Sequence, residues 1–185
     1  MSGGTWCRLA AAFCLALSLS ACVTAPPRAP DAAPALQGRM ALRVAESPSG
    51  PAQSVSASFE LSGHEHHGEL RLFSPLGTVL ALAQWSPQGV TLDSGQGPQA
   101  YANLDELSRS ALGESVPLAA LPSWLKGQPW PGADVQWQVP AGDAGGPRFW
   151  QADWLVDASR LEAEGWVEAR REQPPAVRLR IRLDR

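Results

Sequence analysis

The stretch Glu69–Trp85, ELRLFSPLGTVLALAQW, constrains the fold of this chain more than any other. Two runs of strand-favouring residues flank Ser74-Pro75-Leu76-Gly77, which has the composition of a tight turn. Proline presets φ at the second position, the serine before it accepts a local hydrogen bond, and glycine closes the turn. The stretch therefore predicts an antiparallel hairpin with Leu76 at its tip.

Leu76 occupies the position of the hairpin that is most exposed to water. A leucine kept in water forgoes about 1.5–3 kcal/mol of burial. Two interpretations follow: other parts of the fold cover this side chain, or the tip enters something apolar, such as a bilayer or another protein. The residues alone leave both open.

The second arm of the hairpin, Thr78–Trp85, is apolar on both of its faces. Leu80 and Leu82 share one face. The opposite face carries Val79, Ala81, Ala83 and Trp85. A strand of this kind is covered on both faces or lines an apolar hollow.

Alternation in the flanking segments predicts further half-buried strands, joined by turns that draw on the chain's 17 glycines and 17 prolines. The clearest are Gly38–Ala45, Ser54–Leu61 and Ala176–Leu183, where apolar residues recur at every second position. Shorter strands are expected at Val90–Asp93, Gln99–Tyr101, Asp134–Val139, Arg148–Asp157 and Glu164–Arg170. The chain is therefore predicted to be mainly β.

Two helical segments interrupt this pattern. Asn103 is a good N-cap before an apolar stripe that runs to Gly113, and a second apolar segment covers Leu118–Leu125. Pro122 lies inside the second segment, so a kink or a restart is expected there. Two short helices in the middle of a β chain often cap or plug a barrel.

The N-terminus has the pattern of a targeting signal. Arg8 precedes the apolar run Leu9–Leu19, which is too short to span a bilayer. The run ends in Leu19-Ser20-Ala21-Cys22, which resembles the bacterial lipobox. The resemblance implies that residues 1–21 are a signal peptide and that Cys22 receives a diacylglycerol and an N-acyl group. An ordinary secretory signal with a chance cysteine is the alternative.

The segment after the signal separates it from the fold. Residues 22–35 are rich in alanine and proline and lack periodicity, which predicts a flexible tether behind the acylated cysteine. Val23 stands where aspartate would signal retention, and by resemblance to lipoprotein sorting this implies the outer membrane. Residues 36–185 then suffice for one domain.

Nothing in the sequence marks a catalytic or nucleic-acid-binding site. The net charge of −3 gives no support to nucleic acid binding. The three histidines, His64, His66 and His67, share one loop, and neither a free thiol nor a distant histidine is left to complete a zinc site. Phosphate-loop and nucleophile-elbow motifs do not occur. We expect neither an enzyme nor a metal site, and no cofactor besides the lipid on Cys22.

The last predicted strand places Arg178, Arg180 and Arg182 on the face opposite its aliphatic residues. These arginines can pair with Glu164 and Glu168 on the preceding strand, each pair contributing under about 1 kcal/mol. Alternatively, the row docks an acidic partner or lipid phosphates. The acidic residues of matching spacing favour the first interpretation.

Several motifs, taken in their order, resemble the LolB family of outer-membrane lipoprotein receptors. They are the lipobox, the SPLG hairpin, the segment P-L-x-x-L-x-x-W-L-x-G-x-P from Pro117 to Pro129, the Q-x-x-W strand from Gln151 to Trp154, and a final strand of alternating arginine and aliphatic residues. The resemblance runs from Leu36 to Arg185 and so covers the predicted domain.

The resemblance implies an incomplete, half-open antiparallel β-barrel with short helices covering a hydrophobic cavity. In that family the cavity takes the acyl chains of lipoproteins handed over by the periplasmic carrier LolA, and the receptor inserts them into the outer membrane. The implied partners are a LolA-like carrier, lipoprotein cargo and outer-membrane lipid, met by a lipid-anchored protein on the periplasmic face. We expect a monomer. A structural or scaffold lipoprotein with a closed core is the alternative.

Strand alternation and the helical stripe give the expected lining of the cavity. The strands are expected to contribute Met40, Leu42, Val44, Val55, Phe59, Leu70, Leu72, Leu80 and Leu82. The helices are expected to contribute Leu118, Leu121 and Trp124. By resemblance, Leu76 is the protruding tip that enters the membrane.

Overall fold

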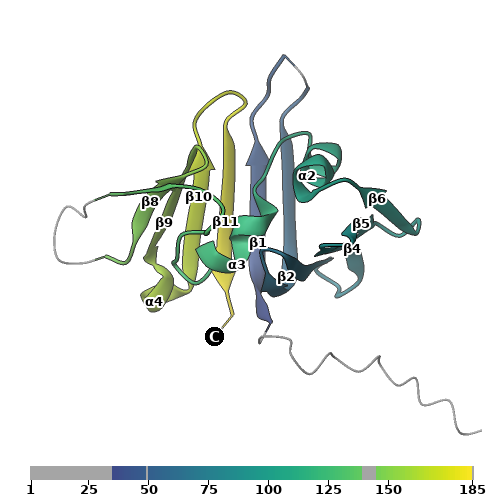
Figure 1. Ribbon diagram of the computed structural model, residues 1–185, viewed down its shortest axis with the longest axis horizontal. Coiled ribbons are helices and arrows are strands. Elements are labelled where there is room, and N and C mark those ends of the chain that lie inside the picture. The colour runs from purple at the N-terminus through teal and green to yellow at the C-terminus, as the bar shows by residue number, and fades with distance from the viewer. Residues whose placement is uncertain (1–34, 49, 139–144, 185) are drawn as a thin grey trace, which may run out of the picture. The chain divides into compact units, whose positions relative to one another are not determined.

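An antiparallel sheet of 11 strands forms the framework of the computed structural model, which describes residues 35–48, 50–138 and 145–184 (Figure 1). The strands lie in the order β6-β5-β4-β3-β2-β1-β11-β10-β9-β8-β7. Neighbours in sequence pair with one another, and β1 joins β11. The two edges, β6 and β7, are not paired with each other in the described residues, so the predicted half-open, mainly β architecture is confirmed.

The strand bounds agree with the alternation pattern at most positions. The strands are β1 (Leu36–Val44), β2 (Gln53–His64), β3 (His67–Phe73), β4 (Val79–Ser86), β5 (Gly89–Asp93), β6 (Pro98–Tyr101), β7 (Val135–Trp137), β8 (Arg148–Gln151), β9 (Trp154–Arg160), β10 (Trp166–Arg171) and β11 (Val177–Leu183). The helical elements are α2 (Leu104–Leu112), the 3₁₀ segment η1 (Leu118–Ala120), α3 (Leu121–Trp124) and α4 (Leu161–Glu164).

The register of the sheet separates an apolar inner face from a charged outer face. Leu42 of β1 lies between Leu179 of β11 and Val55 of β2, because directly paired residues share a face. One position further along β1, Arg43 pairs with Arg178 on the opposite face. The elements α2, η1 and α3, which we call the helical cover, lie over the inner face (Figure 1).

The helical cover begins and ends as the sequence predicts. The Asn103 side chain accepts a hydrogen bond from the Glu106 N–H at 2.8 Å, and α2 stops at Gly113 with φ 73°. Pro122 divides the second helical segment, so that η1 is followed by a new helix, α3. Proline is tolerated in the first turn of α3, where its missing N–H would have no partner.

Two strand predictions were wrong, one in its middle and one at its start. The segment predicted as one strand over Arg148–Asp157 is the hairpin β8–β9, which turns at Ala152 and Asp153 with φ of 49° and 66°. This turn contains neither glycine nor proline, so the sequence shows no break there. The segment predicted as a strand from Glu164 instead begins with the end of α4, and its strand starts at Trp166.

Candidate functional site

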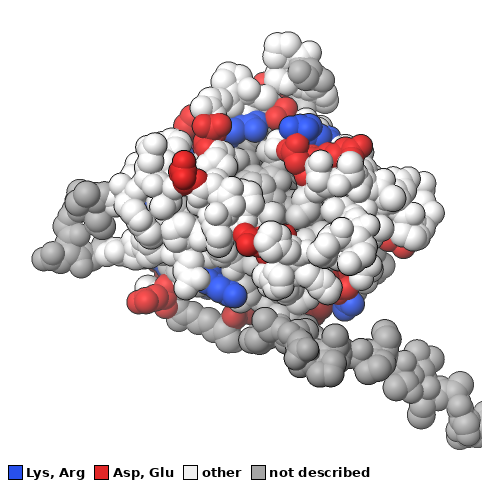
Figure 2. Space-filling view, in the orientation of Figure 1, with Lys and Arg blue, Asp and Glu red and all other residues white. Residues whose placement is uncertain are grey.

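The interior between the sheet and the helical cover is apolar. Phe59 and Leu179 of the sheet expose 3% and 1% of their surface, and Leu121 and Trp124 of the cover expose 2% and 1%. Among the described residues, Ser108 and Gln151 are the buried polar side chains. Figure 2 views the molecule from the side of the cover: most of this face is uncharged, charged side chains gather toward its top and bottom, and a small acidic group lies near its middle.

Gln151 of β8 fixes the cover to the sheet from inside this apolar region. Its Oε1 accepts hydrogen bonds from Trp124 Nε1 at 2.9 Å and from the Trp130 N–H at 2.8 Å. Its Nε2 donates to the carbonyls of Trp130 at 2.7 Å and Ala133 at 2.8 Å. The amide therefore uses all four of its hydrogen-bonding positions. Trp154, the tryptophan of the Q-x-x-W motif, also contacts the cover: its ring centroid lies 6.1 Å from that of Trp124.

Ser108 is satisfied within the cover. Its hydroxyl donates to the Asp105 carbonyl at 3.0 Å and accepts from the Val116 N–H at 3.1 Å. Ser115 also donates to the Asp105 carboxylate. The buried side chains of Ser108 and Gln151 are both hydrogen-bonded within the protein, so neither is available to bind a polar ligand. The interior therefore favours an apolar ligand.

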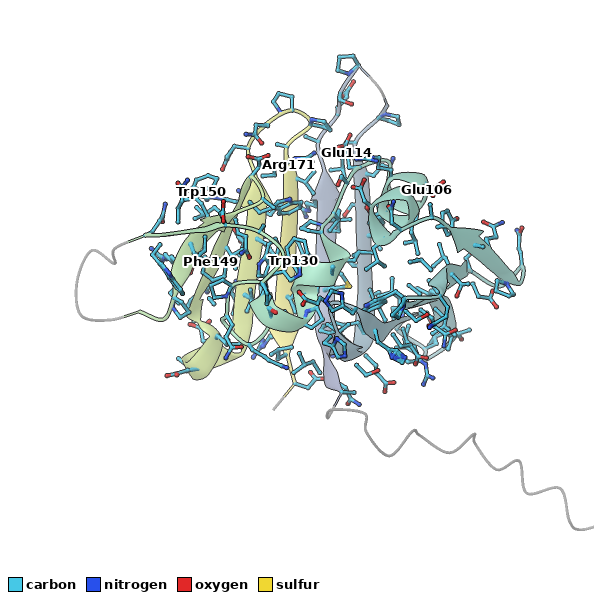
Figure 3. The ribbon with its side chains drawn as sticks, in the orientation of Figure 1. Glu106, Glu114, Trp130, Phe149, Trp150 and Arg171 are labelled. Carbon is cyan, nitrogen blue, oxygen red and sulfur yellow. The ribbon has the colours of Figure 1, made fainter. Side chains whose placement is uncertain are left out.

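An ion pair links the segment after α2 to the end of β10, and we call it the clasp. Arg171 Nη2 lies 2.8 Å from Glu114 Oε2, and the two side chains expose 14% and 19% of their surface (Figure 3). Arg171 also donates to the carbonyls of Ser115 and Pro175. Sequence reasoning missed the clasp because its partners are 57 positions apart and no local pattern connects them.

Most of the predicted wall residues lie on the inner face. The buried ones are Leu42, Val44, Phe59, Leu70, Leu118, Leu121 and Trp124. Met40 and Leu72 are half-buried and pack against this core. Val55 shares the inner face with Leu42 but is 37% exposed.

The assignment of Leu82 to the wall was wrong. Leu82 pairs with Arg71 and Asp93, so its side chain lies on the outer face. Leu80 is skipped where the pairing shifts between Leu72 and Phe73, and it exposes 46% of its surface. It is therefore not enclosed as predicted.

The inner residues of β4 are Ala83 and Trp85. Ala83 pairs with Leu70 of β3, which sets the inner face of this strand. Trp85 covers Gly68 on that face and donates from Nε1 to the His64 carbonyl at 2.9 Å. Because β4 is apolar on both faces, its period does not reveal which side is inward.

Leu76 lies at the tip of the β3–β4 hairpin and exposes 94% of its surface. The turn is well hydrogen-bonded: Ser74 N donates to Thr78 O at 2.8 Å, and Ser74 Oγ accepts from the N–H of Leu76 and of Thr78. Val79 and Leu80, 53% and 46% exposed, extend the apolar surface behind the tip. No described part of the fold covers Leu76.

The predicted lipidation site, Cys22, lies outside the described residues, as do the predicted signal peptide 1–21 and nearly all of the tether 22–35. The described helices are all too short or too polar to cross a bilayer. The anchor therefore stays a prediction from the lipobox.

Comparison with known proteins places these features in a family. The family model described as outer membrane lipoprotein LolB matches residues 34–184. The outer-membrane lipoprotein LolB of Thiobacillus denitrificans is 33% identical over 166 residues, which cover 85% of each chain. Its counterpart in Alkalilimnicola ehrlichii is 34% identical over 166 residues, 80% of each chain. That of Bordetella pertussis is 31% identical over 96% of this chain and 92% of its own.

Proposed function

The chain belongs to the LolB family and is thus an outer-membrane lipoprotein of the localisation pathway, and we propose that it accepts lipoproteins by their acyl chains and inserts them into the membrane. In this proposal a LolA-like periplasmic carrier delivers the cargo. The receptor acts as a monomer, held at the periplasmic face by acylated Cys22. The process requires binding and transfer, with no covalent step.

One observation carries the proposal: the interior is apolar, and its two buried polar side chains are satisfied within the protein. Moving a methylene group out of water is worth about 0.8 kcal/mol, and the contact has no directional requirement. Such an interior suits acyl chains of differing length, because affinity depends on the apolar area buried.

Side chains of the helical cover fill the interior in this structure, since Leu118, Leu121 and Trp124 all belong to the core. Entry of acyl chains therefore requires the cover to move away from the sheet. The cover consists of short elements of 9, 3 and 4 residues, interrupted at Pro122. Opening breaks the Gln151 hydrogen bonds and the clasp and uncovers Leu121 and Trp124, and acyl chains that take the place of these side chains restore apolar contact with the sheet.

Leu76 supports the delivery step. An apolar side chain on a hydrogen-bonded turn can enter the acyl region of a bilayer without unfolding the hairpin. A carboxylate at the same position would resist entry, because a charge in the membrane interior costs on the order of 2.5–3.5 kcal/mol.

A two-step transfer assay with Leu76→Glu tests the proposal. Lipoprotein acceptance from the carrier should match wild type, because the tip is remote from the interior, and the thermal midpoint should be unchanged. Transfer from the receptor to liposomes should fall at least about tenfold, as expected for a charge penalty above about 1.4 kcal/mol.

Gln88→Glu is the matched control, because it introduces the same charge at the neighbouring β4–β5 turn, where Gln88 is also exposed. It should transfer normally. Normal delivery by Leu76→Glu would contradict the role of the tip. Failure of the wild type to accept any cargo would instead favour the scaffold lipoprotein, whose core stays closed.

A further inference from the structure

The outer face of β1, β11 and β10 carries an unusual concentration of arginine. The register aligns three rows across these strands. One row is Arg43–Arg178–Arg170, the next is Ala41–Arg180–Glu168, and the third is Arg39–Arg182–Trp166. We call the six arginines the arginine face. They are 6 of the 15 lysines and arginines in a chain whose net charge is −3.

Acidic neighbours neutralise only part of this charge. Glu168 carboxylate oxygens lie 3.0 Å from Arg180 and 3.8 Å from Arg178, so one carboxylate serves two guanidinium groups. Within residues 35–48, 50–138 and 145–184, Arg39, Arg43 and Arg182 form no ion pair. The expected pairing with Glu164 does not occur, because Glu164 pairs with Arg160.

Two further acids lie near these arginines. Glu172 partly offsets Arg170, because its Oε1 lies 3.3 Å from Arg170 Nε. The second acid, Asp157, is engaged elsewhere. Asp157 of β9 lies 2.9 Å from Arg148. Burial acts to raise the pKa of Asp157, but hydrogen bonds from Ser159 and from Arg148 outweigh it, so the pKa is lowered. Its charge is therefore already balanced by Arg148 and does not offset the arginine face.

Arginine faces arginine directly in three cross-strand pairs: Arg43–Arg178, Arg178–Arg170 and Arg39–Arg182. Like charges directly opposite each other destabilise a sheet. Three like-charged cross-strand pairs on one surface each lower local stability, and their presence together indicates a function for that surface. A bound anion would relieve the repulsion.

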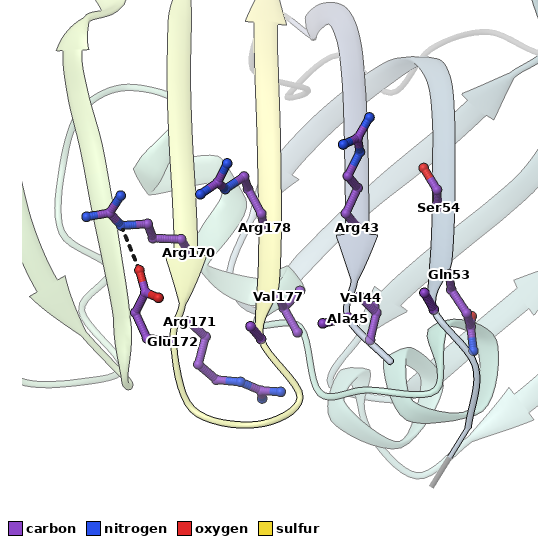
Figure 4. Close-up of a pocket in the computed structure, with 12 residues that line it drawn as sticks. Arg43, Val44, Ala45, Gln53, Ser54, Arg170, Arg171, Glu172, Val177 and Arg178 are labelled. Atoms are coloured by element: carbon purple, nitrogen blue, oxygen red, sulfur yellow. Dashed lines mark ion pairs between the residues drawn. The ribbon is translucent and has the colours of Figure 1, made fainter. Parts of the chain in front are cut away.

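A pocket of about 450 Å³ lies where these strands end. Arg43, Arg170 and Arg178 line it together with apolar residues and with Glu172, which pairs with Arg170, and Figure 4 shows the three arginines on adjacent strands. The Nε–H of Arg170 is buried and makes no hydrogen bond, although Glu172 Oε1 lies 3.3 Å from it. Guanidinium groups match phosphate oxygens in planar, paired geometry.

The pocket lies at the same end of the sheet as the Leu76 tip. Ser54 of β2 pairs with Arg43, while Ser58 of β2 pairs with Phe73, the last residue of β3. Beyond Phe73 the hairpin continues in the direction of the Ser54 end. A basic row and an apolar tip at one end match a surface with anionic headgroups outside and acyl chains within.

We propose that the arginine face docks the protein on anionic phospholipid headgroups, with their phosphates at Arg43, Arg178 and Arg170, while the Leu76 tip enters the bilayer beneath them. Neighbouring strands are about 4.8 Å apart, so the row Arg43–Arg178–Arg170 spans about 10 Å. A row of this length can contact the headgroups of more than one lipid. The inference rests on the proposed function only in taking Leu76 as the membrane probe.

Vesicle sedimentation tests this inference with the mature chain carrying Cys22→Ala, so that no acyl anchor contributes. Wild type should bind vesicles that contain phosphatidylglycerol more tightly than vesicles of phosphatidylcholine alone, and added salt should weaken this difference. Arg43→Gln/Arg178→Gln should weaken binding to the anionic vesicles about 10- to 25-fold, at roughly fivefold per arginine. Binding to neutral vesicles should not change.

The control is Arg109→Gln/Lys126→Gln, which removes two exposed charges on the side of the helical cover, one from α2 and one from the segment that follows α3. It should bind like wild type. The thermal midpoint of Arg43→Gln/Arg178→Gln should not fall, because the substitution removes a repulsive pair. Leu76→Glu gives a distinct result, since it should weaken binding to neutral and anionic vesicles alike.

Three outcomes would overturn the proposal. Equal binding of wild type and Arg43→Gln/Arg178→Gln to anionic vesicles would exclude headgroup docking. Saturable binding of inorganic phosphate, with no preference for anionic vesicles, would make the pocket a site for free phosphate. Normal vesicle binding by the variant with lost acceptance from the carrier would assign the face to an acidic protein.

Discussion

Gln151 should contribute strongly to the stability of the fold, because its amide attaches the helical cover to the sheet. Gln151→Leu keeps the approximate size of the side chain but leaves Trp124 Nε1, the Trp130 N–H and two carbonyls without partners. Each buried unpaired group costs about 1–3 kcal/mol, and relaxation recovers part of the sum, so the free energy of unfolding should fall by about 3–5 kcal/mol. Chemical denaturation measures it.

Gln136→Leu on the exposed side of β7 is the control for this experiment and should change stability by less than about 0.5 kcal/mol. A loss below about 1 kcal/mol for Gln151→Leu would mean that water or rearrangement satisfies the four groups. In that case the amide would not be the attachment point of the cover.

The position of a single residue could be predicted from the sequence where neighbouring residues alone determine it. Leu76 could be placed correctly because Ser-Pro-Leu-Gly determines a turn by itself. Leu82 could not, because β4 is apolar on both faces and its orientation depends on the pairing of Leu70 with Ala83. The role of Gln151 was also hidden, since its partners belong to segments 18 to 27 positions away.

At the scale of elements, the clasp between Arg171 and Glu114 should control how readily the helical cover opens. Arg171→Met removes the ion pair and two hydrogen bonds to carbonyls while keeping most of the side-chain volume. Stability should fall by about 1–3 kcal/mol, because the pair is largely shielded from water. Amide hydrogen exchange should rise over residues 114–125 and remain slow in β1, β2 and β11.

Arg109→Met is the matched control, because Arg109 pairs with Asp105 on the exposed surface of α2, where such a pair contributes under about 1 kcal/mol. If Arg171→Met instead raised exchange equally in the sheet and the cover, the clasp would be part of the global core. Opening of the cover would then need a different cause.

The ends of the helices could be predicted from the sequence, but one turn between strands could not. Caps and prolines act locally, so Asn103, Gly113 and Pro122 marked the limits of α2 and the break between η1 and α3. The β8–β9 turn was missed because Ala152 adopts a positive φ that its residue type disfavours, and only the surrounding sheet makes it necessary.

At the scale of the whole molecule, the pairing of β1 with β11 brings the two ends of the fold together and leaves β6 and β7 as open edges. The half-open barrel followed from the family resemblance, whereas the pairing of β1 with β11 was not predicted, because alternation alone does not specify which strands pair. The same sheet presents an apolar inner face to the cover and an arginine-rich outer face to the surroundings. The proposed division of labour is that the inner face holds acyl chains and the outer face meets headgroups.

Photo-crosslinking with a diazirine-labelled fatty acid shows directly whether acyl chains bind between the sheet and the helical cover. The mature chain with Cys22→Ala is illuminated with the probe, digested, and mapped by mass spectrometry. We expect saturable labelling on peptides that contain Phe59 of the sheet and Leu118, Leu121 or Trp124 of the cover, and competition by unlabelled fatty acid. Labelling that does not saturate, or that is confined to outer-face residues such as Leu82, would contradict an acyl-chain site beneath the cover.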